Sequence, residues 1–255
     1  MNRRPRTERA ARAVSPSIDL PPEQVHLWCA FTEDLGAPSL VEQYRHLLGD
    51  DERRREADFR TPDARQRYVI TRALVRTMLS RYVRHDPRAW AFATTEHGRP
   101  YIANAEGSAR GLVFNLSHTR GLVVLGVTRE HALGVDVEHQ ERPMSPGVMH
   151  RIFSTDEVAA IDALPVDRHA RHLLQHWTLK EAYIKARGMG LALALRHVSF
   201  DMTSEERIRF APSPEVDDDP DRWRFWQQQV GEYVVAVCAE GSGLQLVTRR
   251  VGALG

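Results

Sequence analysis

The chain has 255 residues, of which 42% are hydrophobic and 27% charged, and its formal net charge is +1 at pH 7. This length accommodates one large domain or two small ones, and the apolar fraction suffices for a buried core. A charge so close to zero argues against a protein that coats nucleic acid, because such proteins are usually strongly basic.

The cysteines and the N-terminal segment narrow the class of protein further. Cys29 and Cys238 are too few and too far apart to indicate a disulfide framework or a metal site. No apolar run reaches about 18 residues, so we expect no membrane-spanning helix. Residues 1–20 are rich in arginine, proline and alanine at their start and lack the apolar stretch of a secretory signal. We therefore predict a disordered tail on a cytoplasmic protein.

Residues 21–132 alternate strand-like and helical segments. Residues 62–83 place apolar side chains at helical spacing, with arginines on the opposite face. Gly98 and Pro100 indicate one turn, and Gly121 indicates a second, tight turn. We predict strands at 25–31, 89–94, 113–117 and 122–128, helices at 38–48 and 62–83, and a charged helix or turn at 50–59.

Residues 133–255 begin with a strand and contain the longest helical stretch. Ser154 and Glu157 have the spacing of a capping box, which predicts a helix that continues to about Leu164. A second helix over 168–187 is expected to end at Gly188. We predict strands at 133–138, 197–202, 223–229 and 232–239, and an acidic, proline-containing surface loop at 204–221.

Two ten-residue segments resemble each other and suggest an internal duplication. Residues 121–130 read GLVVLGVTRE, and residues 231–240 read GEYVVAVCAE. Each is rich in strand-forming residues and closes its half of the chain. We predict a mixed α/β (α+β) fold with two similar subdomains, the first at 21–132 and the second at 133–255.

The segment GVDVE at residues 134–138 carries two acidic side chains on one face of a strand. Alternation sends Asp136 and Glu138 to one side and the two valines to the other. Neighbouring carboxylates repel each other, and their burial is costly without a cation or donors. Hard oxygen ligands of this kind suit Mg²⁺. The alternative is a half-exposed strand with two solvated acids.

The segment WTLKEAYIK at residues 177–185 places Glu181 and Lys185 on one face of a helix, four residues apart. One interpretation is an ordinary i,i+4 ion pair worth a few tenths of a kcal/mol. The other is that Glu181 completes a metal site and Lys185 reaches a phosphate.

Two turns carry further candidates for binding phosphate. Ser117 and His118 lie at a strand end and could donate hydrogen bonds to phosphate oxygens. The alternative is ordinary turn chemistry for Ser117 and a surface histidine for His118. Arg99 lies between Gly98 and Pro100 and could aim its guanidinium at a phosphate. As a lone tripeptide, GRP is a generic turn.

The order of these motifs is more specific than any one of them. The chain contains GRP at 98–100, NLSH at 115–118, GVDVE at 134–138, FSTDE at 153–157, WTLKEAYIK at 177–185 and GMGL at 188–191. This series resembles that of the 4′-phosphopantetheinyl transferase superfamily, over residues 53–191. In its length and in the similarity of residues 121–130 and 231–240, the chain resembles the Sfp type of this superfamily. That resemblance implies a monomer with a pseudo-twofold arrangement and coenzyme A bound between the halves.

The resemblance implies a reaction and a set of catalytic residues. A phosphopantetheine arm would pass from coenzyme A to a serine of an apo carrier protein, with an acyl, peptidyl or aryl carrier domain as partner and no nucleic acid or membrane. Carriers of fatty-acid, polyketide, nonribosomal-peptide or siderophore synthesis all fit, so secondary metabolite biosynthesis is one setting. The family's Mg²⁺ ligands fall on Asp136, Glu138 and Glu181. Lys185 would contact the phosphate, and Glu181 is the candidate base.

The resemblance also implies where coenzyme A binds. The residues expected to contact its nucleotide and phosphates are Arg55, Arg67, Arg99, Ser117, His118 and Lys185. Arg53 and Arg72 are further candidates for the 3′-phosphate. For Glu157 of the FSTDE segment we favour helix capping over chemistry.

Two rival functions use the same residues. A pyrophosphohydrolase of coenzyme A would use the same carboxylates with water as the nucleophile. A module that only binds a carrier or a coenzyme would need no turnover, but it fits less well because all three carboxylates and Lys185 are present.

Overall fold

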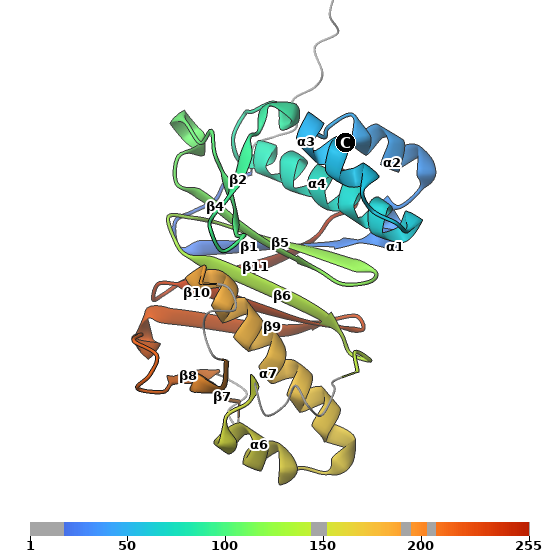
Figure 1. Cartoon of the computed structure of the whole chain (residues 1–255). Coiled ribbons are helices and arrows are strands. Elements are labelled where there is room, and N and C mark those ends of the chain that lie inside the picture. Colours follow the sequence, from blue (N-terminus) through green and yellow to red (C-terminus); the bar gives the residue numbers. More distant parts are fainter. Residues whose placement is uncertain (1–17, 144–151, 190–194, 203–207, 255) are drawn as a thin grey trace, which may run out of the picture.

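Two sheets lie face to face, and each is covered on its outer side by a long helix (Figure 1). The computed structural model describes residues 18–143, 152–189, 195–202 and 208–254. The predicted tail at 1–20 lies almost entirely outside the described residues.

The first half consists of a four-stranded sheet in the order β11-β1-β5-β4 and a group of helices on its outer face. The hairpin formed by β2 and β3 stands beside them. The strands are β1 (Gln24–Phe31), β2 (Phe92–Thr94), β3 (Pro100–Ile102), β4 (Leu112–His118), β5 (Leu122–Arg129) and β11 (Gln245–Arg250), and the helices are α1 (Thr32–Leu35), α2 (Pro38–Arg45), α3 (Asp50–Ala57) and α4 (Pro62–Tyr82).

The second half consists of a three-stranded sheet in the order β6-β10-β9, covered by α7, with the β7–β8 hairpin beyond it. Its strands are β6 (Leu133–His139), β7 (Val198–Asp201), β8 (Arg209–Pro212), β9 (Trp223–Val230) and β10 (Tyr233–Glu240), and its helices are α6 (Thr155–Asp162) and α7 (Val166–Arg187).

Local sequence explains where the two long helices begin and end. Thr61 caps α4, since its side chain accepts a hydrogen bond from the backbone N–H of Ala64, and Pro62 takes the first helical position. Helix α7 ends at Gly188, which has the left-handed conformation (φ 69°) that favours glycine. These helices are 21 and 22 residues long, so each extends across its whole sheet.

Three apolar layers hold the four structural layers together. Between the sheets, alternate residues of both inner faces are buried, such as Leu27 and Val124 against Val135 and Val237. A second core packs α4 on the first sheet, and a third packs α7 on the second sheet. The apolar core between the sheets contains side chains from both halves. Neither half therefore buries the inner face of its sheet without the other.

The two similar segments occupy equivalent places in the two halves. Strand β5 lies between β1 and β4, and β10 lies between β6 and β9. Each strand follows a turn that contains a glycine with positive φ, 92° at Gly121 and 60° at Gly231. The predicted mixed α/β fold with two similar halves is confirmed.

Some boundaries predicted from the sequence are wrong. Strand β11 was expected in the second subdomain at 133–255, but it pairs in parallel with β1 and completes the first sheet. Strand β8 occupies part of the segment 204–221 that we predicted as a loop, because residues 209–212 pair with β7. The predicted strand at 89–94 begins only at Phe92, after a 3₁₀ turn.

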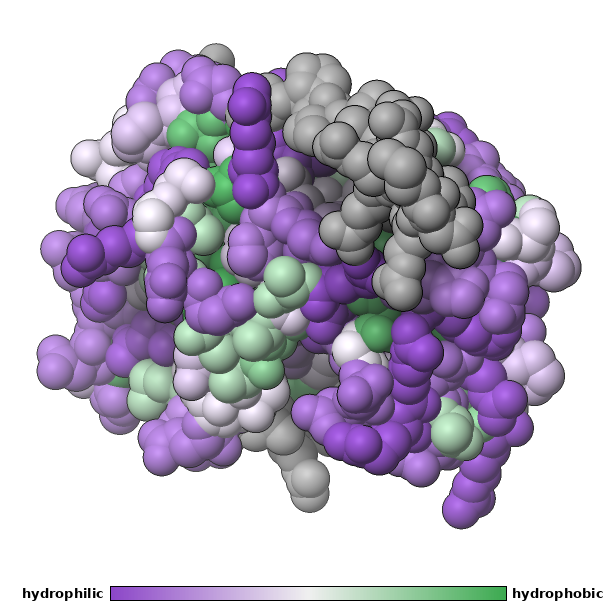
Figure 2. Space-filling view, turned by 90° about the horizontal axis from the view of Figure 1, so that it is seen from above, coloured by the Kyte–Doolittle hydropathy of each residue, from purple (hydrophilic) through white to green (hydrophobic). Residues whose placement is uncertain are grey.

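The described surface is polar over most of the face above α2, α3 and α4 (Figure 2). Exposed arginines contribute to it, among them Arg53, Arg54, Arg55, Arg60 and Arg65. Within the described ranges, no helix has the length and apolarity needed to cross a membrane.

Candidate active site

Strand β6 presents its two acidic residues to helix α7, as the alternation predicts. Val135 and Val137 are buried between the sheets. Asp136, which is 4% exposed, contacts Lys185 of α7, and Glu138 lies on the same face of the strand. The predicted clustering of Asp136 with the α7 residues is therefore present.

The side chains of Ser117, Asp136 and Lys185, which come from three different elements, contact one another. The Lys185 ammonium lies 2.6 Å from Oδ1 of Asp136 and donates to Ser117 Oγ (3.0 Å) and to the carbonyl of Val135 (3.1 Å). The Ser117 hydroxyl also donates to Asp136 Oδ1 at 2.9 Å. Strands β4 and β6 and helix α7 thus join at one polar centre between the halves.

A glycine allows α7 to lie this close to β6. A Cβ atom at Gly134 would collide with the backbone of α7 at Ala182 and Ala186. Because Ala182 follows Glu181 and Ala186 follows Lys185, this contact brings the part of α7 that carries both candidates onto the strand that carries Asp136.

Glu181 lies on α7 between the charges of this centre. Burial, reinforced by the negative charge of Asp136, raises the pKa of its carboxyl, while Lys185 and Arg142 act in the opposite direction. Among the described ion pairs, Lys185 pairs with Asp136 and not with Glu181. The simple i,i+4 pair considered from the sequence is not formed.

Glu138 has a cationic partner that the sequence did not indicate. Its carboxylate forms an ion pair with Arg142, and the guanidinium of Arg142 lies 4.9 Å from the centre of the Trp177 ring. The Arg142 side chain therefore connects the end of β6 to helix α7.

The donor chemistry of this centre fits a hard divalent cation. Asp136, Glu138 and Glu181 offer only carboxylate oxygens, and the buried Oδ2 atom of Asp136 has no hydrogen-bond partner among the described residues. Lys185 and Arg142 neutralise two of these carboxylates. In this arrangement, no three acidic, histidine or cysteine side chains of the described residues are grouped closely enough to hold a metal ion.

His118 and Arg67 bring the basic face of the first half to the same centre. His118 is exposed at the end of β4. Partial burial, together with the positive charges of Arg67 and Lys185, lowers its pKa. Arg67 on α4 is half-buried, and Arg55 on α3 is exposed. The side chains of Arg67, His118 and Lys185 thus come from both halves and face one electropositive region.

The other arginine candidates have partners within the protein. Arg72 forms an ion pair with Glu52 at 2.6 Å, and Arg53 donates to the carbonyl of Leu48 at 3.2 Å. Arg99 donates from both Nη atoms, to the carbonyls of Ala186 (3.0 Å) and Leu133 (3.2 Å).

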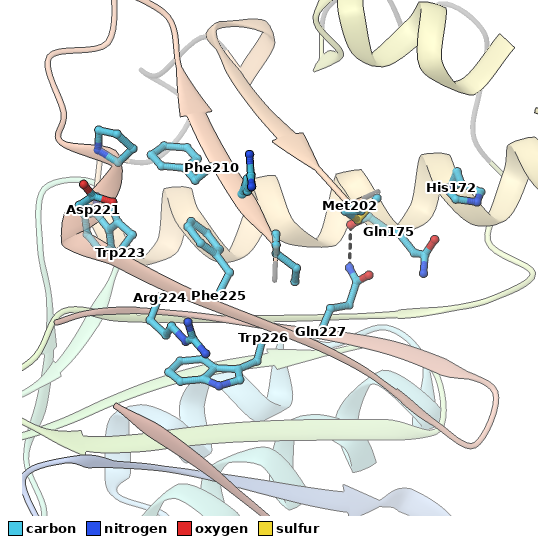
Figure 3. Close-up of a pocket in the computed structure, with 13 residues that line it drawn as sticks. His172, Gln175, Met202, Phe210, Asp221, Trp223, Arg224, Phe225, Trp226 and Gln227 are labelled. Atoms are coloured by element: carbon cyan, nitrogen blue, oxygen red, sulfur yellow. Dashed lines mark hydrogen bonds between the residues drawn. The ribbon is translucent and has the colours of Figure 1, made fainter. Parts of the chain in front are cut away.

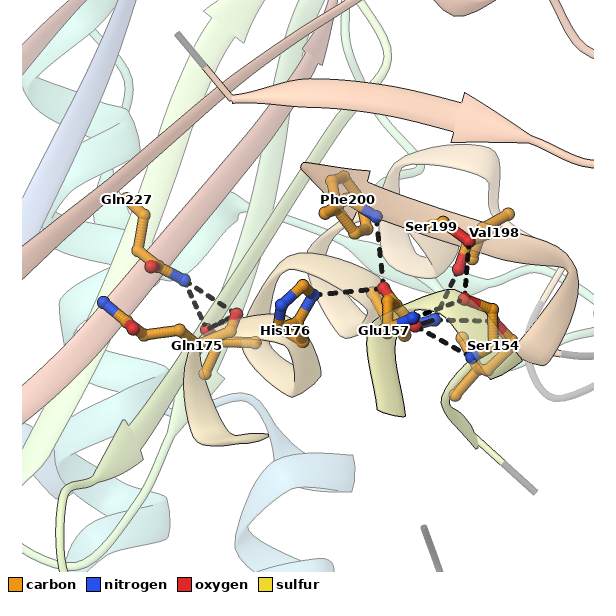
Figure 4. A network of polar contacts seen from close by, with 11 residues as sticks. Ser154, Glu157, Gln175, His176, Val198, Ser199, Phe200 and Gln227 are labelled. Atoms are coloured by element: carbon orange, nitrogen blue, oxygen red, sulfur yellow. Dashed lines mark hydrogen bonds and ion pairs between the residues drawn. The ribbon is translucent and has the colours of Figure 1, made fainter. Parts of the chain in front are cut away.

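A buried polar network supports α7 behind the centre (Figure 4). Glu157 completes the predicted capping box with Ser154 and also accepts from the backbone N–H of Phe200. Its carboxylate lies 2.6 Å from Nζ of Lys180, which is fully buried. Burial alone would raise the pKa of Glu157, but the hydrogen bond from His176 and the charge of Lys180 lower it. The preference for capping over chemistry agrees with these contacts.

A cavity of about 630 Å³ lies away from this centre, between β9, the β7–β8 hairpin and the first turns of α7 (Figure 3). Aromatic side chains line one end and polar ones the other, including Phe210, Trp223, Phe225, His172 and Gln175. Of the residues that the structure describes, none of those predicted for the active site lines it.

Comparison with known proteins assigns both halves of the chain to one family. Residues 132–238 match the model of the 4′-phosphopantetheinyl transferase superfamily, and residues 38–130 match the model of the N-terminal part of a 4′-phosphopantetheinyl transferase. The two matches cover the strands, helices and turns that meet at Asp136.

Three relatives span most of the chain. The 4′-phosphopantetheinyl transferase HetI of Nostoc sp. is 30% identical over 202 residues, which cover 78% of this chain and 83% of HetI. A phosphopantetheinyl transferase of Thraustochytrium sp. is 31% identical and covers 86% of this chain and 80% of its own length. The 4′-phosphopantetheinyl transferase Sfp of Bacillus subtilis is 27% identical, with 78% and 84% covered.

In both halves, the chain with this two-sheet fold is thus similar to a family of group-transfer enzymes. The chain belongs to the 4′-phosphopantetheinyl transferase superfamily and is of the Sfp-like type.

Proposed function

We propose that this chain moves the phosphopantetheine arm of coenzyme A onto a serine of an apo carrier protein, with Mg²⁺ as the cofactor. Membership of the family supports the transferase activity. The observation that carries the proposal is the meeting of Asp136, Lys185 and Ser117 at one buried centre, with Glu181 beside it.

The reaction is a displacement at the β-phosphorus of coenzyme A. The carrier serine oxygen forms a bond to this phosphorus, the bond to the bridging oxygen breaks, and 3′,5′-ADP leaves. The serine proton passes to a base, for which Glu181 is the candidate because it lies on α7 beside Asp136 and Lys185, directly or through a metal-bound water. Lys185 and His118 would donate to the phosphate oxygens as charge builds on them.

The metal would be held by the carboxylates of Asp136, Glu138 and Glu181. When bound, Mg²⁺ supplies charge neutralisation on the pyrophosphate oxygens. Lys185 neutralises Asp136 in the structure described here, so it is placed to move its charge from the carboxylate to a substrate phosphate.

Coenzyme A would lie along the junction of the halves. Ser117, His118 and Arg67 border the polar centre, and Arg55 on α3 would extend the basic face toward the 3′-phosphate. Arginine suits this role because its planar fork matches phosphate oxygens. We expect the protein to act as a monomer, with acyl, peptidyl or aryl carrier domains as partners.

Intact-mass spectrometry of an apo carrier protein tests the function. With coenzyme A and Mg²⁺, we expect the carrier to gain the mass of the phosphopantetheine arm, and we expect EDTA or Asp136→Ala to prevent this. Glu181→Gln should slow transfer by roughly 100-fold or more, since a general base contributes on that order. The exposed Glu141→Gln serves as a matched control with unchanged transfer.

Two results would contradict the proposal. Consumption of coenzyme A without modification of any carrier would indicate a hydrolase. Tight binding of coenzyme A with neither consumption nor transfer, across several carrier types, would indicate a binding module. Wild-type transfer by Glu181→Gln would overturn only the assignment of the base.

A further inference from the structure

Strands β4 and β6 are edge strands of different sheets, and a side chain bridges them. Oδ1 of Asn115 on β4 accepts a hydrogen bond from the backbone N–H of Val135 on β6 at 2.9 Å. Asn115 is only 4% exposed, so this bond is shielded from water. An amide oxygen thus takes the place that a paired strand would fill with a carbonyl.

This bond holds the peptide group that precedes Asp136. The N–H of Val135 is bound by Asn115, and its carbonyl accepts from Lys185 at 3.1 Å. Asn115 and Ser117 are two residues apart on β4, so they share one face of the strand. That face therefore binds the backbone at Val135 and the carboxylate of Asp136 together.

Arg99 forms a second bridge between the halves. It lies in the turn between β2 and β3 of the first half, and its guanidinium donates to the carbonyls of Ala186 on α7 and Leu133 on β6. These carbonyls flank the close contact of Gly134 with α7. Burial lowers the pKa of Arg99, whereas the carbonyls that accept from its guanidinium favour the charged form.

The two bridges have a physical consequence for the reaction. Loss of the Asn115 oxygen would leave a buried N–H without its acceptor, which favours movement of β6 away from β4. A displacement of about 1 Å at a reacting centre can lower the rate on the order of 100-fold. Small shifts at these bridges would therefore separate Asp136 from Ser117.

We propose that Asn115 and Arg99 are positioning residues that set the spacing between the β4 edge, which carries Ser117 and His118, and the β6–α7 pair, which carries the carboxylates and Lys185. This inference rests on the proposed function. It replaces a direct nucleotide contact by Arg99, expected from the family resemblance, with a contact between the halves.

The test separates positioning from binding of coenzyme A. Asn115→Ala and Arg99→Met are each compared with the wild-type enzyme for kcat of carrier modification and for Kd of coenzyme A by calorimetry. We expect kcat to fall at least about 10-fold, with a Kd for coenzyme A within about 3-fold of the wild-type value. Arg99→Lys, which keeps the charge and one donor group, should recover part of kcat.

A matched control shows whether any lost hydrogen bond to α7 has the same effect. Gln227 on β9 donates from its side-chain amide to the carbonyl of Gln175 and to Thr178, about two turns or more of α7 before Lys185. Gln227→Ala should lower the Tm and leave kcat unchanged. Amide hydrogen exchange at Val135 gives a readout that needs no activity, and Asn115→Ala should accelerate it.

The outcomes distinguish the alternatives. If Asn115→Ala and Arg99→Met lower only the Tm, as Gln227→Ala does, the residues are structural and the proposal is wrong. If Arg99→Met raises the Kd of coenzyme A and leaves kcat unchanged, Arg99 binds the nucleotide instead. If the wild-type enzyme modifies no carrier, the proposed function fails first, and the exchange rate of Val135 still reports whether Asn115 holds β6.

Discussion

His26 shows how a single buried residue acquires a defined protonation state. It is fully buried on β1, with Nδ1 2.9 Å from the Tyr82 hydroxyl and Nε2 2.9 Å from Oε1 of Gln24. Trp28 donates its indole N–H to the oxygen of Tyr82 at 2.6 Å. Because Oε1 of Gln24 can only accept, Nε2 carries a proton, and in the neutral imidazole Nδ1 accepts from the Tyr82 hydroxyl.

The pH dependence of stability should reveal this state. Burial, together with the charge of Arg249 and against that of Asp19, lowers the pKa of His26 to about 4. The unfolded chain binds the proton near pH 6.5, so stability falls as the pH decreases through this range. From pH 7.5 to 5.5 the wild-type protein should lose about 1 kcal/mol more unfolding free energy than His26→Gln.

Urea unfolding at the two pH values measures this difference. His26→Gln is expected to be less stable at pH 7.5, because it disrupts the chain of hydrogen bonds, but its stability should change less on acidification. Equal pH dependence in both proteins would show that folding does not lower the pKa of His26, and would contradict the prediction.

The contacts between candidate site residues were predictable where both residues belong to a motif. Asp136, Lys185 and Ser117 come together as the motif order predicts. Asn115 lies within the NLSH motif, but its partner is a backbone N–H of the other half, which no local pattern reveals. Arg142 follows no motif, and its role depends on the fold that brings Trp177 to it.

A buried ion pair connects helices α6 and α7 and contacts the backbone of β7. Lys180 on α7 pairs with Glu157 on α6 and donates to the carbonyls of Leu195 and Val198, while Glu157 accepts from the N–H of Phe200. The segment 195–201 is thereby held against the helix that carries Glu181 and Lys185. The capping box at Glu157 was evident from the sequence, but the second partner of its carboxylate was not.

Removal of one member of this pair should be costly. Lys180→Met leaves the Glu157 carboxylate buried without its cation, and we expect a loss of about 3–5 kcal/mol of unfolding free energy. The double variant Glu157→Gln/Lys180→Met should be less destabilised than the sum of the two single variants, because no unpaired charge remains.

Urea unfolding of the three variants measures the coupling. The exposed pair of Arg88 and Asp86 provides the control, since loss of an exposed ion pair changes stability by at most about 1 kcal/mol. If Lys180→Met changed stability no more than Arg88→Met does, the buried pair would contribute no specific stabilisation.

The two similar halves explain why the candidate active site lies at their junction. Each half places a long helix outside a sheet, and the edges of the two sheets meet at β4 and β6. The inner faces share one core, so the halves are held at a fixed separation. The duplication could be predicted from the similarity of residues 121–130 and 231–240. These segments form β5 and β10, which occupy equivalent positions in the two sheets.

The last strand could not be placed from the sequence. Residues 245–250 read QLVTRR, which is too polar and too charged to indicate a sheet, and their partner β1 lies more than 200 positions earlier. Parallel pairing between distant segments depends on the whole fold. The last strand, β11, therefore belongs to the sheet of the first half, although it follows every strand of the second half in the sequence.

This placement of β11 should make the first half depend on the end of the chain. Val251 and Leu254 are both 3% exposed and pack into the core beneath α4, and the N–H of Val251 donates to the carbonyl of Cys29 at 2.9 Å. Val251→Asp buries a carboxylate there, and we expect a loss of at least about 3 kcal/mol of unfolding free energy. Ala253→Asp adds the same charge at an exposed position two residues later, so it should change stability by less than about 0.5 kcal/mol. Urea unfolding decides between them: equal stability of the two variants would mean that the segment after β11 does not belong to the core of the first half.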